Sequence, residues 1–258
     1  MRVLLLGGTG EARALAEWLH PTVDIISSLA GRVPNPALPV GPVRIGGFGG
    51  AGGLRDWLAD NGVTAVVDAT HPFAATITAH AASACAELAL PHVLLSRPPW
   101  DPAGATMVVS DTDAAKVIAA RGYSRVFLTT GRSGVTAFAD SEAWILIRVV
   151  TAPAAAVLPR NHELVRSRGP YHYTSERELL SSRRIQVLVT KNSGGALTQA
   201  KLDAARDLDV DVIMISRPAL PARVQVVDSV EQAARWVAAL ASTGVMPGRE
   251  SSRGSAGA

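Results

Sequence analysis

The sequence has almost no cysteine and no hydrophobic run of membrane-spanning length. Its single cysteine, Cys85, lies in an alanine-rich stretch where helical spacing places it on a packed face, so we expect a core residue. No apolar run approaches the roughly 20 residues that a membrane-spanning helix needs, and the start of the chain lacks the pattern of a signal peptide. We therefore predict a cytoplasmic protein without membrane contact.

Chelating clusters and basic stripes are also lacking. The six histidines are scattered, without acidic or cysteine ligands at a chelating spacing, so no metal site is predicted. The formal net charge is only +3, part of it in the tail after Ser242, which does not favour nucleic acid as a partner. Lysine occurs only at Lys116, Lys191 and Lys201, and the other basic residues are arginines. A GC-rich genome explains this bias as well as a functional demand does.

Aromatic residues are scarce at 5%, whereas hydrophobic residues make up 48% of the chain. Short apolar runs rich in Val and Leu alternate with alanine-rich amphipathic segments, which predicts an α/β fold with mostly parallel sheets and right-handed crossovers. The predicted strands are 2–6, 22–29, 43–45, 65–69, 92–96, 107–109, 125–129, 144–150, 163–167, 186–190 and 212–216, and the predicted helices are 10–20, 53–61, 74–90, 111–121, 175–184, 197–208 and 229–240.

The length of 258 residues is enough for roughly two domains. A proline-rich segment after the fifth strand marks the boundary, because domain boundaries fall in such linkers. We predict two Rossmann-like domains, residues 1–98 and 99–241, with an interdomain cleft, followed by a disordered Gly- and Ser-rich tail at 242–258.

Ligands of such folds bind outside the carboxyl ends of the strands, so the residues that follow each strand are the candidates for function. The first strand is followed by GGTGEA, with Gly8, Thr9, Gly10 and Glu11. Glycines allow close approach of a pyrophosphate, and Thr9 is placed to cap a helix whose positive end faces it. The motif is not the strict GxGxxG fingerprint, and a tight turn without a ligand is the alternative.

The second strand ends in SSLAGR, where an NAD enzyme usually carries an acidic residue for the ribose hydroxyls. Ser27, Ser28 and Arg32 instead offer hydrogen-bond donors and a positive charge, which suit a 2′-phosphate. The segment therefore favours NADP over NAD, with a capped loop and a solvated arginine as the alternative.

The third strand is followed by GGFGGAGG, which contains Gly47, Phe48 and Gly49. So many glycines cost conformational entropy on folding, which indicates that a ligand passes close to this backbone. Phe48 is a candidate to lie against a flat ring, and an ordinary turn anchor is the alternative.

The fourth strand ends in DATHPFA, which places Thr70 and His71 where nicotinamide normally lies in such folds. His71 is a candidate proton donor, because histidine changes its charge near neutral pH. A histidine before proline also serves as a structural turn residue, so both roles stay open.

Donor-rich loops also follow strands of the second half, in the segments TTGRSG, TKNSGGALTQAK and SRP. Asn192, Ser193 and a glycine pair precede a predicted helix, and Lys191 and Lys201 add positive charge. We interpret these loops as a binding site for an anion, which is either a carboxylate of the substrate or a phosphate of the cofactor.

Taken in order, the segments GGTGEARALA, SSLAGR, VVDATHPFA, RPPW, VFLTTGR, RGPY, LVTKNSGG and MISRP resemble the precorrin-6A reductase family. The resemblance runs from Arg2 to about Leu240. It implies an NADPH-dependent reductase of cobalamin (vitamin B12) biosynthesis that converts precorrin-6A to precorrin-6B by reducing one double bond of the macrocycle. A related enzyme acts on the cobalt-containing substrate, and the sequence leaves open which form this chain takes.

The resemblance implies that the amino half holds NADPH and that the carboxyl half grips the macrocycle. The substrate is a polycarboxylate tetrapyrrole, which arginines such as Arg148 can pair in bidentate fashion. The candidates for substrate binding are Arg97, Thr130, Gly131, Arg132, Arg168, Lys191, Asn192, Ser193, Gly194, Thr198, Lys201 and Arg217. If the reaction needs an acid, His71 or a bound water is the candidate. The alternative is that the conjugated nitrogens of the substrate serve as an electron sink and no strong acid is required. Hand-over of the product to neighbouring enzymes of the pathway is a further expectation.

Two other functions are weighed as alternatives, a different NADP enzyme and a binding protein without catalysis. A short-chain dehydrogenase or sugar epimerase uses a Tyr and a Lys about one helical turn apart, and none of Tyr123, Tyr171 or Tyr173 has a lysine nearby. A sensor that binds NADPH without catalysis would show no oxidation of NADPH in the presence of precorrin-6A.

Overall fold

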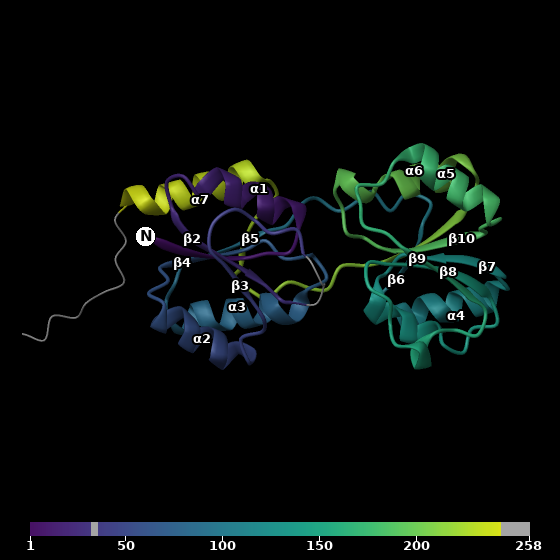
Figure 1. Ribbon diagram of the computed structural model, residues 1–258, viewed down its shortest axis with the longest axis horizontal. Coiled ribbons are helices and arrows are strands. Elements are labelled where there is room, and N and C mark those ends of the chain that lie inside the picture. The colour runs from purple at the N-terminus through teal and green to yellow at the C-terminus, as the bar shows by residue number, and fades with distance from the viewer. Residues whose placement is uncertain (32–35, 244–258) are drawn as a thin grey trace, which may run out of the picture. The chain divides into compact units, whose positions relative to one another are not determined.

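The computed structural model describes residues 1–31 and 36–243 of the chain. The chain divides into two compact units (Figure 1). Unit 1 comprises Met1–Ser96 together with the chain from Leu220 onward, and unit 2 comprises Arg97–Ala219. The predicted α/β class with parallel sheets is confirmed, because each unit contains one six-stranded parallel sheet.

Unit 1 is a doubly wound sheet with helices on both faces. Its strands lie in the order β12-β5-β4-β1-β2-β3, and all of its strand pairs are parallel. One face is covered by α1 and α7 and the other by α2 and α3 (Figure 1). The elements are β1 (Arg2–Leu6), α1 (Gly10–Leu19), β2 (Asp24–Leu29), β3 (Val43–Ile45), α2 (Gly50–Asp60), β4 (Ala65–Asp68), α3 (Ala75–Glu87), β5 (His92–Leu95), β12 (Gln225–Val227) and α7 (Val230–Thr243).

Apolar periodicity explains why these segments of unit 1 form a layered core. Helix α1 buries Ala12, Leu15, Ala16 and Leu19, a stripe at helical spacing that packs on the sheet. The central strand β1 is buried on both faces, with one set of side chains facing α1 and α7 and the other facing α2 and α3. Because all strands of this sheet are parallel, their carboxyl ends lie along one edge of the sheet.

Unit 2 repeats this architecture. Its strands lie in the order β6-β11-β10-β7-β8-β9 and are parallel throughout. Helices α5 and α6 cover one face and α4 the other (Figure 1). The elements are β6 (Thr106–Val108), α4 (Asp111–Arg121), β7 (Arg125–Leu128), the 3-10 helix η1 (Arg132–Phe138), β8 (Trp144–Val149), η2 (Ala155–Val157), β9 (His162–Arg166), α5 (Tyr173–Ser182), β10 (Val187–Lys191), η3 (Ala196–Thr198), α6 (Ala200–Asp207) and β11 (Asp211–Ile215).

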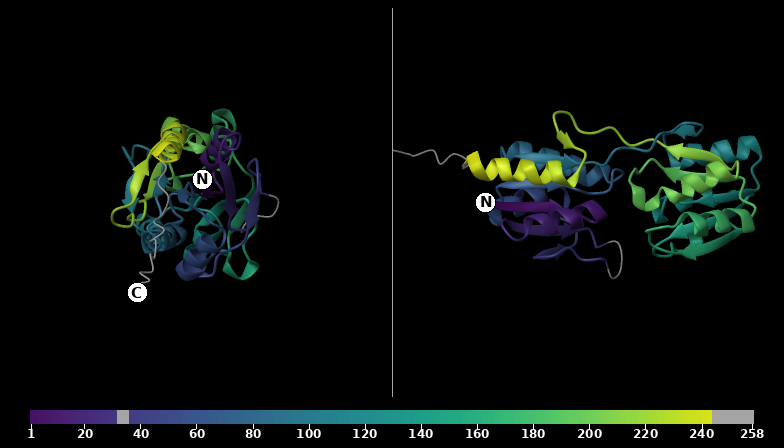
Figure 2. Two further views of the ribbon diagram at one scale, coloured as in Figure 1. Left: turned by 90° about the vertical axis from the view of Figure 1, so that its left-hand side faces the viewer. Right: turned by 90° about the horizontal axis from the view of Figure 1, so that it is seen from above.

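The last strand of the chain returns to unit 1. Strand β6 begins unit 2 and pairs with β11 of the same unit, whereas β12 follows β11 in the chain but pairs with β5 of unit 1. One further backbone hydrogen bond extends the pairing of each of these edge strands. Ser96 N–H donates to the carbonyl of Val227, and Ser216 N–H donates to that of Val108. The chain therefore crosses between the units twice, and Figure 2 shows the yellow α7 with the fold that contains the N-terminus.

The return of the chain to unit 1 corrects the predicted second domain, 99–241, because the chain from Leu220 onward belongs to unit 1. The missed strand β12 is only three residues long and mostly exposed, so its short apolar run is not distinguished from the surrounding loop in the sequence. Helix α7 then packs against α1 of unit 1. The helix also extends to Thr243, past the predicted start of the tail, and the remainder of that tail lies outside the described residues.

Other expectations differ by small shifts. Helix α2 begins at Gly50 instead of Gly53, and the helix predicted at 197–208 is divided into η3 and α6. Cys85 is a buried free thiol of α3, as predicted, and burial raises its pKa to about 12. Within residues 1–31 and 36–243, no helix has the length and apolar character of a membrane span and no acidic, His or Cys cluster suits a metal ion.

Candidate functional site

The carboxyl edge of the unit 1 sheet brings together residues that follow β1, β2 and β3. Leu6, at the end of β1, is in register with Ser28 of β2, and Ser28 is in register with Arg44 of β3. The glycine turn that follows β1 therefore lies at the same edge as Ser28 and Arg44.

The turn between β1 and α1 is open to a ligand. Gly8 has a φ of +113°, and a Cβ built there would meet nothing within 4 Å. Thr9 is the predicted cap: its Oγ1 accepts the amide N–H of Ala12 at 3.0 Å and donates to the carbonyl of Ala69 at 2.8 Å. The Thr9 hydroxyl therefore fixes the turn, whereas Gly10 and Glu11 form the first residues of α1. The N-terminus of such a helix favours an anion.

Arg44 is the charged centre of this edge, and the sequence prediction missed it. Its Nη1 donates to Ser28 Oγ at 3.1 Å and to the carbonyl of Gly46 at 2.8 Å, and its Nη2 donates to the carbonyl of Gly47 at 2.9 Å. Burial lowers the pKa of Arg44 from its ordinary value. We name Ser28, Arg44, Gly46, Gly47 and Phe48 the Arg44 cluster.

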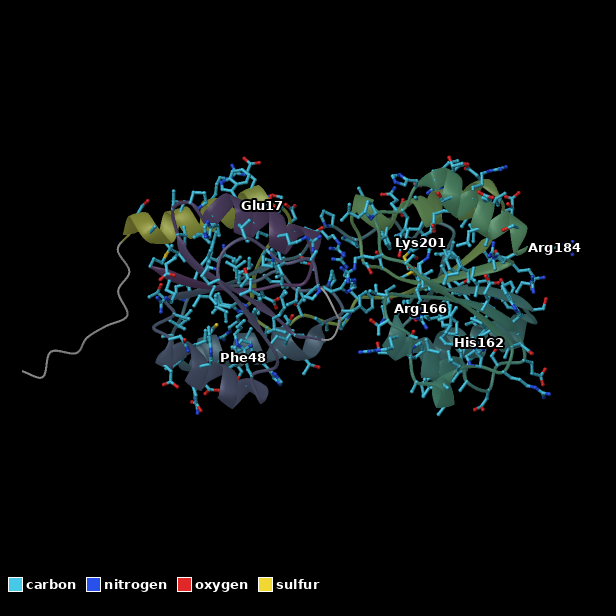
Figure 3. The ribbon with its side chains drawn as sticks, viewed as in Figure 1. Glu17, Phe48, His162, Arg166, Arg184 and Lys201 are labelled. Carbon is cyan, nitrogen blue, oxygen red and sulfur yellow. The ribbon has the colours of Figure 1, made fainter. Side chains whose placement is uncertain are left out.

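Phe48 packs under this arginine. The guanidinium carbon of Arg44 lies 3.7 Å from the centre of the Phe48 ring, and Trp57 meets Phe48 edge-on at 5.5 Å. Figure 3 labels Phe48 on the side of the sheet covered by α2. A Cβ at Gly53 would lie 1.8 Å from the Phe48 carbonyl oxygen, so only glycine allows this approach. Arg44 thus occupies one face of the ring that was predicted to lie against a ligand.

Strand β4 ends in a buried carboxylate that shapes the next turn. Asp68 Oδ1 accepts the amide N–H of Thr70 at 3.0 Å and its hydroxyl at 2.6 Å. His71 follows and is exposed; its Nδ1 accepts the amide N–H of Phe73 at 3.2 Å. In the neutral ring this bond leaves the proton on Nε2.

In unit 2, the loop that follows β10 is held by two arginines. We name residues Asn192 to Gly195 the Asn192 loop. Arg97 Nε donates to the carbonyls of Ser193 and Gly194 at 2.8 and 3.0 Å. Arg217 donates from Nε to the carbonyl of Asn192 at 2.9 Å and from Nη2 to that of Ser193 at 3.1 Å. These arginines, which were predicted to bind substrate, therefore fix the loop.

The side chain of Asn192 completes this arrangement. Its Oδ1 accepts the amide N–H of Trp100 at 2.8 Å, and its Nδ2 donates to the Trp100 carbonyl at 3.1 Å. Gly194 has a φ of +68°, and a Cβ there would lie 2.0 Å from the carbonyl oxygen of Pro98. The loop is therefore rigid, and glycine is required at its tightest point.

A buried cationic group lies behind this loop. Lys201 is 5% exposed; its Nζ donates to the carbonyl of Thr198 at 2.8 Å and lies 4.4 Å from the centre of the Trp100 ring. Burial lowers the pKa of Lys201 to about 7, and the nearby charge of Arg148 adds to the effect. Figure 3 labels Lys201 within the fold of unit 2.

Arg148 forms an internal ion pair, which corrects its expected role in binding substrate carboxylates. Its Nη1 and Nη2 donate to the two carboxylate oxygens of Glu176 at 2.8 and 2.7 Å, and the two side chains are 7% and 2% exposed. The guanidinium also packs over Tyr171 at 4.1 Å. Its bidentate face is thus already used by Glu176.

The other predicted residues are placed as follows. Lys191 Nζ donates to the carbonyl of Thr130 at 2.9 Å, which brings the loops after β7 and β10 together. Thr130 Oγ1 is buried and has no hydrogen-bond partner in the described part of the chain. Arg132, which follows Gly131, and Arg168 are exposed. Arg32 lies outside the described residues.

Three residues that organise these sites were missed from the sequence. Arg44 lies in β3, one residue before its end, whereas the predicted 2′-phosphate residues belong to β2 and the loop after it. Trp100 and Glu176 act through contacts with residues far away in the chain. The position of Arg44 next to the glycine-rich segment after β3 is the signal in the sequence that points to it.

Comparisons with known proteins agree on one family. The family model described as "Precorrin-6x reductase CbiJ/CobK" matches residues 2–238. A "Precorrin-6A reductase" of Mycobacterium tuberculosis is 68% identical over 93% of this chain and 99% of its own length. A "Precorrin-6A reductase" of Rhodococcus erythropolis is 52% identical over 93% of this chain and 98% of its own length. A solved structure, "CobK precorrin-6A reductase", superposes with a TM-score of 0.85 at 40% identity, covering 96% of this chain and 98% of that one.

Proposed function

The chain belongs to the precorrin-6x reductase family, so it is an oxidoreductase that reduces precorrin-6A in cobalamin biosynthesis, and we propose that it takes the hydride from NADPH held by unit 1. Both units have the strand order of the dinucleotide-binding fold. The single observation that carries the choice of unit is the open glycine turn after β1, which leads directly into the N-terminus of α1, whereas β7 of unit 2 is followed by the 3-10 helix η1.

The residues of unit 1 fit a nicotinamide dinucleotide. Open space surrounds the backbone of Gly8, Gly47 and Gly49, where a Cβ would meet nothing within 4 Å. The amide groups at the start of α1 suit a pyrophosphate. Ser27 Oγ is buried and lacks a hydrogen-bond partner among the described residues. When bound, NADPH would supply a hydride to the substrate.

We retain His71 as the proton donor in this proposal. The hydrogen bond from the Phe73 amide to Nδ1 leaves the neutral ring with its proton on Nε2, where it can donate a hydrogen bond. Proton transfer from Nε2 requires the imidazolium, so Nδ1 first takes up a proton and gives up its bond to Phe73, and the ring is neutral again after the transfer. The side chain is exposed, which allows contact with a substrate. Asp68 and Thr70 hold the preceding turn and so position the ring.

Unit 2 supplies cationic groups for a polycarboxylate tetrapyrrole. Arg132 and Arg168 are exposed, and Lys191 lies at the end of β10 beside the Asn192 loop. Arg97 and Arg217 hold that loop and carry positive charge at its base. Carboxylates are bound most strongly by such charge-assisted hydrogen bonds. The proposal also includes a cytoplasmic location and hand-over of the product to a neighbouring enzyme.

The test is an assay of the purified full-length protein with precorrin-6A and either NADPH or NADH. We expect absorbance at 340 nm to fall with NADPH and much more slowly with NADH. A substrate-free reaction is the control for non-productive oxidation. Faster oxidation of NADH would overturn the choice of cofactor, and binding of NADPH without oxidation would favour a sensor.

A further inference from the structure

Arg44 is fixed in place by the backbone that follows its own strand. Both hydrogens of Nη1 and one of Nη2 are used by Ser28 Oγ and by the carbonyls of Gly46 and Gly47. The ring of Phe48 supports the plane of the guanidinium at 3.7 Å. A long and normally mobile side chain is thus held in one orientation before any ligand binds.

Arg44 keeps its Nε–H and one hydrogen of Nη2 for another acceptor. No acceptor within the described ranges takes these two hydrogens, and no carboxylate there forms an ion pair with Arg44. Two N–H groups of one guanidinium suit the oxygens of a phosphate. Because burial lowers the pKa of Arg44, a bound anion would offset the cost of its partial desolvation.

The position of Arg44 on the sheet identifies which phosphate this edge suits. Ser28, which Arg44 contacts, is the next-to-last residue of β2, and NAD enzymes carry the acid for the adenosine ribose at the end of this strand. In this chain the hydroxyl of Ser28 and the guanidinium of Arg44 lie there instead of a carboxylate. A carboxylate would repel a 2′-phosphate, whereas these two groups can donate hydrogen bonds to it. The pyrophosphate is expected at the other strand of the pair, beside the turn after β1.

We propose that Arg44, oriented by Ser28 and by the carbonyls of Gly46 and Gly47, binds the 2′-phosphate of NADPH and determines selectivity for NADPH over NADH. This inference rests on the proposed use of NADPH by unit 1. It transfers the main role in phosphate selectivity from Arg32 to Arg44. Phe48 is then a support for Arg44, through the face that the guanidinium covers.

The test is calorimetric titration of the full-length protein with two fragments, 2′,5′-ADP and 5′-AMP, which differ by the 2′-phosphate. We expect the wild type to prefer 2′,5′-ADP, and Arg44→Gln to lose about 10- to 100-fold in affinity for it, the range for a charge-assisted hydrogen-bonded contact. Affinity for 5′-AMP should be unchanged. Arg55→Gln is the matched control, because Arg55 is exposed on the nearby helix α2 and pairs with Asp56.

The outcomes separate this inference from the function on which it rests. A wild type that binds neither fragment would contradict the placement of NADPH in unit 1. A wild type that prefers 2′,5′-ADP, together with Arg44→Gln that keeps this preference, would contradict the role of Arg44 alone. Loss of the preference in Arg32→Ala but not in Arg44→Gln would return the role to Arg32.

A second measurement keeps the inference testable if Arg44→Gln does not fold. Phenylglyoxal modifies accessible arginines, and mass spectrometry of the wild type reports the modified fraction at Arg44. We expect 2′,5′-ADP to protect Arg44 at least several-fold better than 5′-AMP at equal saturation. Equal protection by the two fragments, or none by either, would overturn the assignment.

Discussion

The buried ion pair of unit 2 gives a sharp test of how this fold tolerates charge. Glu176 of α5 accepts two hydrogen bonds from Arg148 and is 2% exposed. Replacement of Glu176 by Gln keeps the shape of the side chain but removes its negative charge. Arg148 is then buried without an anion, and the neighbouring cation Lys201 loses a favourable interaction with Glu176.

The expected cost is about 3–5 kcal/mol, the range for removal of one partner from a buried pair. That is a large share of the about 5–15 kcal/mol by which a folded domain is usually stable. Glu163→Gln is the matched control, because Glu163 pairs with Arg183 at 2.9 Å with side chains 39% and 35% exposed. An exposed pair of this kind contributes about 0–1 kcal/mol.

The assay is urea unfolding followed by far-UV circular dichroism, with hydrogen exchange of β8 and α5 to separate unit 2 from unit 1. Hydrogen exchange is needed because two units unfold as one transition only if they are coupled. The double variant Arg148→Met with Glu176→Leu should recover most of the loss, since it removes both charges. A loss below about 1 kcal/mol for Glu176→Gln, equal to the control, would refute the reasoning.

Two further predictions concern the same unit. Because the pKa of Lys201 falls from 10.5 to about 7 on folding, the unfolded state binds more protons between these values, so stability rises with pH there. Lys201→Met should flatten that rise in unfolding free energies measured at pH 7, 8.5 and 10, and an unchanged slope would contradict the burial of the charge. Gly194→Ala should destabilise the protein more than Gly104→Ala in thermal unfolding, because both glycines have positive φ but only a Cβ at position 194 meets backbone, at 2.0 Å from Pro98 O. Equal losses would mean that the loop moves aside.

The local parts of this fold were predictable because their causes are local. Thr9 caps α1 through an amide three residues away, and Gly8 lies in a turn that its neighbours define. Short Val- and Leu-rich runs marked the long buried strands. The prediction of Asn192 as part of an anion-binding loop depended on glycine and polar residues that stand together in the sequence. Its partner Trp100, 92 residues away, was not visible in that pattern.

The roles of the arginines show the limit of sequence reasoning. The sequence does not distinguish the roles of Arg97, Arg148 and Arg217, and all three were expected to bind carboxylates of the substrate. In the structure Arg148 is bound by Glu176, whereas Arg97 and Arg217 hold carbonyls of one loop. Arg44 was not considered, although its contact with Ser28 follows from the register of β2 and β3. Which acceptor a guanidinium meets depends on chain segments that only folding brings together.

The sequence by itself determined the α/β class, the alternation of strands and helices and the glycine turns, because apolar periodicity and backbone preference act over a few residues. The tertiary structure decided which strands pair, so that β12 joins the sheet of unit 1 although it follows the strands of unit 2 in the chain. It also decided which polar groups are used internally. Strand pairing and ion pairing are contacts between distant segments, and their energies depend on the complete sheet and its core.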